Sequence, residues 1–281
     1  QYTNNTTPCQ ISLFWNKFRF HSFFMKNVKI TAFLFALLIS VTSFAQKTIH
    51  GNGKIVKDDT RKVENFTKIH VAMGIDAYIT QGDGNKISLE ADENVIKLIK
   101  TEVKDGVLKV SLKKNVKNAK KLNAYITAKT INGLIASSGA DVIVKNTITS
   151  SQLTCKVSSG ADLTLSASVD NFDGKASSGA DLIIEKLTAK STNIKASSGA
   201  DIEIQTGKTN SLNANASSAA DIDAEDFSAQ TCSAIASSGA DVEIHVIKSL
   251  NAKATTGGDI SYKGNPTVDK KTTTGGDVDK E

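Results

Sequence analysis

Residues that usually build catalytic and metal sites are scarce in this sequence. Its 281 residues include three cysteines, four histidines and two arginines. Beyond residue 45 the only histidines and arginine are His50, His70, His245 and Arg61, and they form no recognisable catalytic pattern. No phosphate-binding loop, metal-ligand cysteine spacing or Ser-His-Asp pattern occurs. We therefore expect a non-catalytic protein with no catalytic residues, no cofactor and no metal site.

Proline, aromatic residues and long apolar runs are also scarce. The sequence has two prolines and 6 % aromatic residues, and it is rich in Ser, Thr, Ala, Asn and Gly. This composition is typical of many short elements joined by tight turns. The apolar run Ile30–Val41 is shorter than the roughly 20 residues that a membrane-spanning helix needs. We therefore expect no transmembrane span in the mature chain.

The N-terminal 45 residues have the organisation of a secretory leader. Residues 25–29 form a basic start, the apolar run follows, and the small residues before position 46 end at Ala45. These are the three regions of a signal peptide, so we assign residues 25–45 to a Sec signal peptide cleaved after Ala45. Residues 1–24 are interpreted as a spurious upstream extension, the alternative being a real N-terminal segment. Export to the periplasm, the cell surface or the medium is expected.

Loss of the leader removes most of the net charge. The leader holds four of the 34 basic residues and no acidic residue, which leaves 30 basic against 29 acidic residues. A nearly neutral mature chain gives no electrostatic basis for binding nucleic acid. We therefore expect no nucleic-acid partner.

A repeat dominates the second half of the chain. The pentapeptide Ser-Ser-Gly-Ala-Asp and its close variants occur eight times, at intervals of 18 to 21 residues. The marker aspartates are Asp141, Asp162, Asp181, Asp201, Asp221, Asp241, Asp259 and Asp277. Apolar residues at the first and third positions after nearly every marker Asp, such as Val142 and Val144, flank a residue that points the other way, and this period of two predicts strands. Each repeat is therefore expected to hold two or three short strands and no helix.

Repeats of this length cannot bury their own apolar face, so they must stack. Stacking places equivalent residues in columns about 4.8 Å apart. The uneven step length and the lack of six-residue units favour a right-handed, single-stranded parallel β-helix at residues 122–281. Residues 47–121 lack the marker but alternate in the same way and predict a mostly-β cap region, with a short helix after Asp92 and a hairpin turn at Lys104–Gly106.

Segments of the cap region resemble a known family. The stretches Gly74–Asp83, Glu90–Asn94 and Thr101–Leu108 are similar to the DUF2807 family, the putative auto-transporter adhesin, head GIN domain family of Bacteroidetes, and the Ser-Gly-Ala-Asp repeats fit it too. The resemblance implies a right-handed β-helix, an exported location and no established biochemical activity. Because Glu281 follows the last marker by four residues, we expect that the chain is not a complete autotransporter.

The column of marker aspartates is the sharpest candidate site. Neighbouring carboxylates about 5 Å apart repel each other by roughly 1 kcal/mol in water. Two explanations of how this repulsion is offset stay open. Each carboxylate accepts backbone N–H and Ser hydroxyl hydrogen bonds at the corner, which makes the column a structural ladder, or a cation such as calcium binds along it.

The repeat also predicts the state of the two cysteines beyond the leader. Cys155 and Cys232 lie seven and nine residues before their markers, in columns otherwise filled by apolar residues. Four turns separate these markers, about 19 Å along the axis, and a disulfide spans at most about 7 Å between Cα atoms. We therefore expect two buried, unpaired thiols.

These features favour an exported interaction protein of the cell surface or periplasm, such as an adhesin or a glycan-binding protein. Its expected partner is a surface glycan or an extracellular protein. The alternative is a carbohydrate-active β-helix enzyme, a lyase or a hydrolase. That alternative requires a cleft with two carboxylates 5 to 10 Å apart, whereas the repeats carry no insertion that would build a cleft.

Overall fold

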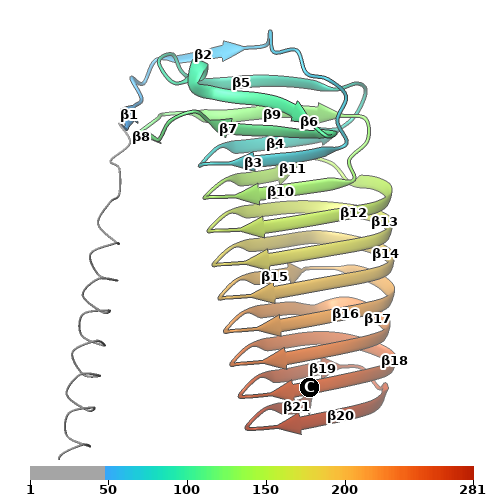
Figure 1. The fold of residues 1–281 in the computed structure, drawn as a ribbon. Coiled ribbons are helices and arrows are strands. Elements are labelled where there is room, and N and C mark those ends of the chain that lie inside the picture. Colours follow the sequence, from blue (N-terminus) through green and yellow to red (C-terminus); the bar gives the residue numbers. More distant parts are fainter. Residues whose placement is uncertain (1–47) are drawn as a thin grey trace, which may run out of the picture. The chain divides into compact units, whose positions relative to one another are not determined.

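The computed structural model describes residues 48–281, which form one body built almost entirely of β-strands (Figure 1). The predictions for residues 1–24 and 25–45 lie outside the described residues. Within residues 48–281 no helix is long and apolar enough to cross a membrane. The only helical element among these residues is the 3-10 helix η1 (Ile96–Leu98). The strands are β1 (Ile49–His50), β2 (Ile55–Asp58), β3 (Lys68–Ala72), β4 (Asp76–Gln81), β5 (Lys86–Asp92), β6 (Ile99–Lys104), β7 (Val107–Leu112), β8 (Val116–Lys117), β9 (Leu122–Ala128), β10 (Gly133–Ser137), β11 (Asp141–Val144), β12 (Ile148–Ser158), β13 (Asp162–Ser177), β14 (Asp181–Ser197), β15 (Asp201–Ile204), β16 (Gly207–Ser217), β17 (Asp221–Ser237), β18 (Asp241–Thr255), β19 (Asp259–Lys263), β20 (Thr267–Thr273) and β21 (Asp277–Lys280).

From Asp141 onward the chain is a coil with one marker per turn. Each turn pairs in parallel with the turns before and after it, residue for residue at the equivalent positions. In Figure 1 the chain descends from turn to turn, and the nearer strands run leftward to the sharp corner while the farther strands run back to the right. This sense of rotation makes the coil right-handed. The predicted all-β, right-handed, single-stranded parallel β-helix is therefore confirmed.

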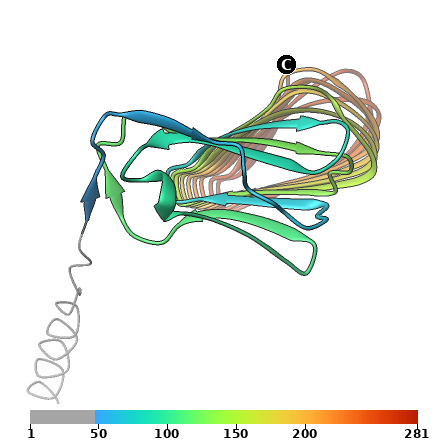
Figure 2. The same ribbon diagram turned by 90° about the horizontal axis from the view of Figure 1, so that it is seen from above.

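Three turns, those of β11 and β12, β15 and β16, and β19 and β20, each hold two strands as predicted, but in four other turns a single long strand forms. Where the sequence indicated two or three short strands per repeat, β13, β14, β17 and β18 each run for 15 to 17 residues. Each begins at a marker Asp, passes around a broad bend and ends at the next corner (Figure 2). Hydrogen bonds to the neighbouring turns continue around this bend, so the strand is not interrupted there.

The corner needs two successive residues in the left-handed conformation. At the first marker these are Ser138, with φ 56°, and Gly139, with φ 69°, and later corners repeat the pair. The conformation costs a non-glycine residue about 1 kcal/mol or more, so the surrounding structure must impose it. Stacking does so, because the backbone N–H of Ser138 donates to the carbonyl of Ser158, one turn further on, and Gly139 donates to Ser159.

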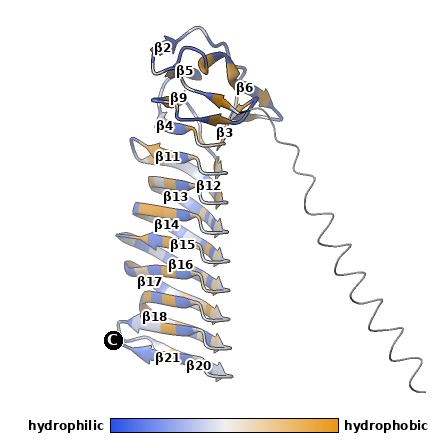
Figure 3. Ribbon diagram, turned by 90° about the vertical axis from the view of Figure 1, so that its left-hand side faces the viewer, coloured by the Kyte–Doolittle hydropathy of each residue, from blue (hydrophilic) through white to orange (hydrophobic). Residues whose placement is uncertain are grey.

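The core consists of columns of identical or similar apolar residues. The position just before each Asp is a fully buried alanine in six successive turns, from Ala140 to Ala240. In the last two turns glycine replaces it at Gly258 and Gly276, where an added Cβ would lie 2.6 Å from backbone atoms of the preceding turn. The final turn, β20 and β21, is mostly hydrophilic (Figure 3), which suits the last turn of a stack.

The cap region continues the coil instead of only covering it. Strands β3 and β4, which lie within residues 47–121, pair in parallel with β10 and β11 and so form the first turn of the stack. On the other side of this turn, β7 pairs with β3 and β9 pairs with β4. Strands β5 and β6 then close the two faces in antiparallel fashion, as seen at the top of Figure 1.

Two local predictions for the cap have different outcomes. The hairpin turn is confirmed, because Asp105 and Gly106, at φ 51° and 72°, join β6 and β7. The capped helix after Asp92 is wrong: only the single 3-10 turn η1 forms, and no side chain caps it. Asp92 is fully buried and instead accepts hydrogen bonds from the backbone N–H groups of Gly53 and Lys120, which fastens two loops of the cap.

The cysteines are buried and free, as the repeat predicted. Burial raises the pKa of both thiols, that of Cys232 to about 12. We expect neither thiol to react with iodoacetamide in the folded protein at pH 8, because almost no thiolate forms there. After unfolding without reductant, intact mass should show two alkyl groups on the mature chain. A chain that takes up none after unfolding would contain a disulfide and would contradict the stacking order.

One buried hydroxyl has no partner in the core. Thr192 stands in the apolar column between Phe172 and Leu212, its side chain is fully buried, and its Oγ1 atom makes no hydrogen bond. A buried polar atom without a partner costs about 1–3 kcal/mol. Thr192→Val should therefore stabilise the protein by roughly 1–2 kcal/mol, measured by chemical unfolding. Thr192→Ser keeps the hydroxyl and loses the methyl group, so it should destabilise, and a loss in the valine variant as well would contradict this explanation.

Candidate functional site

The marker aspartates form one straight column along the sharp corner. Each is paired in register with the next, and the column extends upward to Asp76 at the start of β4. We call this set the Asp ladder: Asp76, Asp141, Asp162, Asp181, Asp201, Asp221, Asp241, Asp259 and Asp277. All members except the partly buried Asp76 are exposed.

The sequence pattern missed Asp76 because no Ser-Ser-Gly-Ala precedes it. A weaker signal was present, since Met73 and Gly74 supply the same two left-handed residues, at φ 67° and 68°, and Ile75 takes the buried position of the alanine. The corner geometry, and not the marker pentapeptide, thus defines the ladder.

The hydrogen bonds predicted for the ladder are largely absent from the described residues. Asp259 accepts from the N–H of Asp277, and Asp277 accepts from the N–H of Val278. The backbone N–H groups of the next turn also act on two further carboxyls, those of Asp162 and Asp201, and lower the pKa of each by a small contribution. In the described part of the chain, no Ser hydroxyl donates to any of the nine carboxylates of the ladder. The proposed Ser hydroxyl donors are absent, and most corner N–H groups donate to carbonyls of the adjacent turns instead. The ladder is therefore a row of mostly solvent-exposed carboxylates, only some of which receive a backbone N–H.

Several carboxyl groups of the Asp ladder have a raised pKa. Partial burial, and after it the charge of the neighbouring carboxylates, raises the pKa of Asp76, Asp162, Asp181, Asp201 and Asp241 above the usual aspartate value. Within residues 48–281 no three His, Cys, Asp or Glu side chains are grouped so that they could hold a metal ion. The ladder is thus a line of single carboxylates, one to a turn.

The histidines lie apart and form no shared site. His70 on β3 is partly buried, with Nε2 2.9 Å from Oγ of Ser137, and burial, followed by the charge of Lys109, lowers its pKa. His245 on β18 lies 3.4 Å from Oγ of Ser228. His50 lies in the cap strand β1, far along the chain from His245 on β18.

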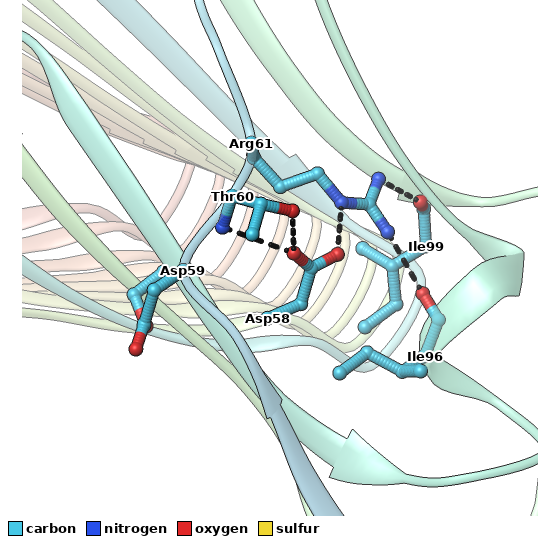
Figure 4. A network of polar contacts seen from close by, with 7 residues as sticks. Asp58, Asp59, Thr60, Arg61, Ile96 and Ile99 are labelled. Atoms are coloured by element: carbon cyan, nitrogen blue, oxygen red, sulfur yellow. Dashed lines mark hydrogen bonds and ion pairs between the residues drawn. The ribbon is translucent and has the colours of Figure 1, made fainter.

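Arg61 has a structural position in the connection between β2 and β3. Its Nε atom donates to Asp58 at 2.6 Å, and its terminal nitrogens donate to the carbonyls of Ile99 and Ile96 at 2.9 and 3.0 Å (Figure 4). All three nitrogens of the guanidinium are therefore occupied. Arg61 fixes this connection against η1 and the start of β6.

The surface of the described body has several shallow hollows. A groove of about 600 Å³ follows the broad bend across five turns, from β12 to β17, and contains the ion pair between Lys190 and Asp170, at 2.8 Å. A second hollow of about 650 Å³ lies in the cap beside Tyr125, and we call it the cap hollow. Two smaller hollows, of about 330 and 300 Å³, lie by Lys145 and by Asp173. None of these four hollows is lined by more than one carboxylate.

Two tyrosines stack on the outer surface at the junction of cap and coil. Tyr78 on β4 and Tyr125 on β9 are paired in register, with ring centroids 5.3 Å apart and planes inclined by 19°. The ammonium of Lys145 lies 4.6 Å from the centre of the Tyr78 ring. Sequence reasoning did not single out this pair. The signal was the tetrapeptide Ala-Tyr-Ile-Thr, which occurs at residues 77–80 and again at 124–127 and marks two stacked segments.

Together the coil, its capped end and its repeated outer columns define a capped, right-handed β-solenoid. A family model described as putative auto-transporter adhesin, head GIN domain (DUF2807) matches residues 65–185 and 171–266. The chain therefore belongs to this family, as the sequence resemblance indicated.

Solved structures share the fold. A putative adhesin from Parabacteroides merdae is 21 % identical, with a TM-score of 0.79, and a putative adhesin from Parabacteroides distasonis is 23 % identical, with a TM-score of 0.78. A putative lipid binding protein from Parabacteroides distasonis is 19 % identical, with a TM-score of 0.79. Each match covers 84 % of this chain and all of the other. No protein with a curated description matches.

Proposed function

We propose that this chain is an exported, non-catalytic adhesin that binds glycans at the outer surface of its solenoid. The observation that carries the proposal is the outer surface itself, which repeats polar side chains in columns along the coil and adds a stacked tyrosine pair at one end, with Tyr125 exposed. An extended polymer with many hydroxyl groups can contact several turns at once. The names of the family and of two structural relatives agree with a role in adhesion.

The hollows support binding over catalysis. Hydrolysis of a glycosidic bond usually needs two carboxylates on either side of the bond, about 5 to 10 Å apart. Each hollow described above offers at most one, and Asp170 in the groove is paired with Lys190. The predicted leader at residues 25–45 would place the solenoid outside the cytoplasm, where glycans are available.

The test is a binding array with the mature chain, residues 46–281. Immobilised microbial and host glycans, extracellular-matrix proteins and lipid vesicles are probed with folded and with heat-unfolded protein. We expect saturable binding to a restricted set of glycans by the folded form only. Binding to no glycan would contradict the proposal, and release of new reducing or unsaturated sugar ends from a bound polysaccharide would favour the carbohydrate-active enzyme.

A further inference from the structure

The cap hollow is walled by three separate parts of the cap. Tyr125 and Thr127 come from β9, Ile87 and Ser88 come from the adjacent β5, and residues 59–63 come from the connection between β2 and β3. Its volume of about 650 Å³ lies within the range of small-ligand pockets. The walls combine one aromatic ring with hydroxyl, amide and charged side chains.

The ring of Tyr125 lines this hollow, is fixed in orientation by its neighbours and remains partly exposed. Tyr78 stacks on one face of Tyr125, and 39 % of the Tyr125 surface remains exposed. Its hydroxyl donates to Glu90 at 3.1 Å, which fixes the orientation of the ring. On the side of Tyr78 and Lys145, Tyr125 borders the smaller hollow of about 330 Å³. Tyr125 also lines the larger cap hollow, beside Ser88 of the neighbouring strand β5, with which it is paired.

The opposite wall is held equally firmly. Arg61 fastens the connection between β2 and β3 through Asp58 and the carbonyls of Ile96 and Ile99 (Figure 4). The Ser88 hydroxyl donates to Asp59, which ties this connection to β5. The hollow is thus formed before any ligand arrives, and a ligand would not have to order either wall.

The chemistry of the walls selects the class of ligand. An aromatic face carries a negative quadrupole and attracts the polarised C–H groups of a flat apolar surface. Around it, Asp59 can accept hydrogen bonds, Lys62 and Lys86 can donate them, and Thr127 can do both. Arg61 is paired with Asp58, so the free charges at the rim are one carboxylate and two ammonium groups, a small basic excess. These groups can accept and donate hydrogen bonds to the hydroxyls of a ligand that carries no charge of its own. A neutral pyranose with equatorial hydroxyls has this combination, because its C–H groups gather on one face and its hydroxyls point outward around the rim.

We infer that the cap hollow is a saccharide-binding pocket in which Tyr125 stacks on a neutral pyranose ring with equatorial hydroxyls, as in β-linked glucose or N-acetylglucosamine chains. The inference rests on the proposed glycan-binding function and assigns it a place. Arg61 acts in this pocket as a positioning residue, because each of its three nitrogens already donates to an oxygen of the protein.

The experiment measures the affinity of the mature chain for cello- and chito-oligosaccharides by calorimetry, with mannan fragments, whose rings carry an axial hydroxyl, for comparison. Tyr125→Ala should weaken binding by about tenfold or more, since stacked aromatic anchors usually dominate such sites. Tyr125→Phe keeps the ring and should stay within about threefold of the original affinity. The control Ile143→Ala removes an equally exposed side chain from the same outer column, outside the hollow, and should leave binding unchanged.

Each outcome separates the pocket from the general function. Equal affinities for all three variants, with unchanged melting temperatures, would overturn the pocket and leave glycan binding elsewhere on the solenoid. Array binding only to glycans that lack such pyranose rings would overturn the ligand class and leave the proposed function standing. If the unmodified chain binds no glycan on the array or in solution, both proposals fail.

Discussion

Gly207→Ala should destabilise the protein by on the order of 4 kcal/mol, the largest loss that we expect from a single methyl group. Gly207 opens β16 at the broad bend, with φ 132°, a conformation open in practice only to glycine. A Cβ atom at this position would lie 1.9 Å from the carbonyl oxygen of Leu187 in the neighbouring turn. That oxygen belongs to the backbone of a paired strand, so relief of the clash would shift the parallel pairing of two turns.

A second glycine provides the matched control. Gly84, in the turn before β5, also has a positive φ, 77°, but an added Cβ would meet nothing within 4 Å. Gly84→Ala should therefore cost only the local strain, about 1 kcal/mol. Both variants are compared by urea unfolding monitored by circular dichroism. Similar losses for the two would show that the close approach of turns at Gly207 does not determine the stability there.

Neutralising alternate members of the Asp ladder should stabilise the protein at neutral pH. In the variant Asp162→Asn, Asp201→Asn, Asp241→Asn, no two neighbours from Asp141 to Asp259 both remain charged. Each relieved contact is worth at most about 1 kcal/mol in water, and screening by salt reduces it further. We therefore expect a rise of several degrees in melting temperature at low salt and a smaller rise in 0.5 M salt.

The pH dependence has a definite sign. The pKa values of these three carboxyls are raised in the folded state, so the folded protein binds protons at a pH where the unfolded chain has lost them. Their contribution to stability is therefore favourable at low pH and becomes unfavourable as the pH rises through the folded-state values. The advantage of the asparagine variant should be full at pH 7, should fall as the pH drops through the raised folded-state values, and should vanish below about pH 3, where aspartate is mostly protonated in both states.

A charge-matched control tests whether position in the ladder matters. The control variant Glu64→Gln, Asp83→Asn, Asp105→Asn removes three exposed acidic groups that lie outside the ladder, and it should change the melting temperature little.

If the ladder variant is instead less stable than the unmodified protein, the carboxylates make attractive contacts in the folded state. Loss of stability on adding EDTA to the unmodified protein would identify that contact as a bound cation, the alternative that the sequence left open.

The period of the repeat was enough to predict the coil from Asp141 onward. The sequence did not predict that β3 and β4 form a turn of the same coil. Eight markers at steps of 18 to 21 residues fix the length of a turn, and alternation around Val142 and Val144 fixes which side chains point inward. The turn formed by β3 and β4 escaped the pattern because its neighbours in space are not its neighbours in sequence. It lies between β7 and β9 on one side and β10 and β11 on the other.

The candidate pocket depends on the same non-local pairing. Tyr78 and Tyr125 are 47 residues apart in sequence, and they meet only because β9 returns to pair with β4. The fixed wall opposite Tyr125 depends on Arg61, whose partners Ile96 and Ile99 are backbone carbonyls. A sequence pattern can indicate an exposed tyrosine, but it cannot indicate which carbonyls an arginine will reach.

The most direct test of the whole account is cross-linking of the first two members of the Asp ladder. Asp76→Cys and Asp141→Cys, introduced together into residues 46–281, place thiols on directly paired residues that are 65 positions apart in sequence. The pair Asp76→Cys, Asp162→Cys lies two turns apart and serves as the control. Under mild oxidation with copper phenanthroline, with the buried native thiols unreactive, we expect an intramolecular disulfide in the first pair and none in the second. No disulfide in the first pair, or equal formation in both, would contradict the stacking that creates the Asp ladder, the tyrosine pair and the cap hollow.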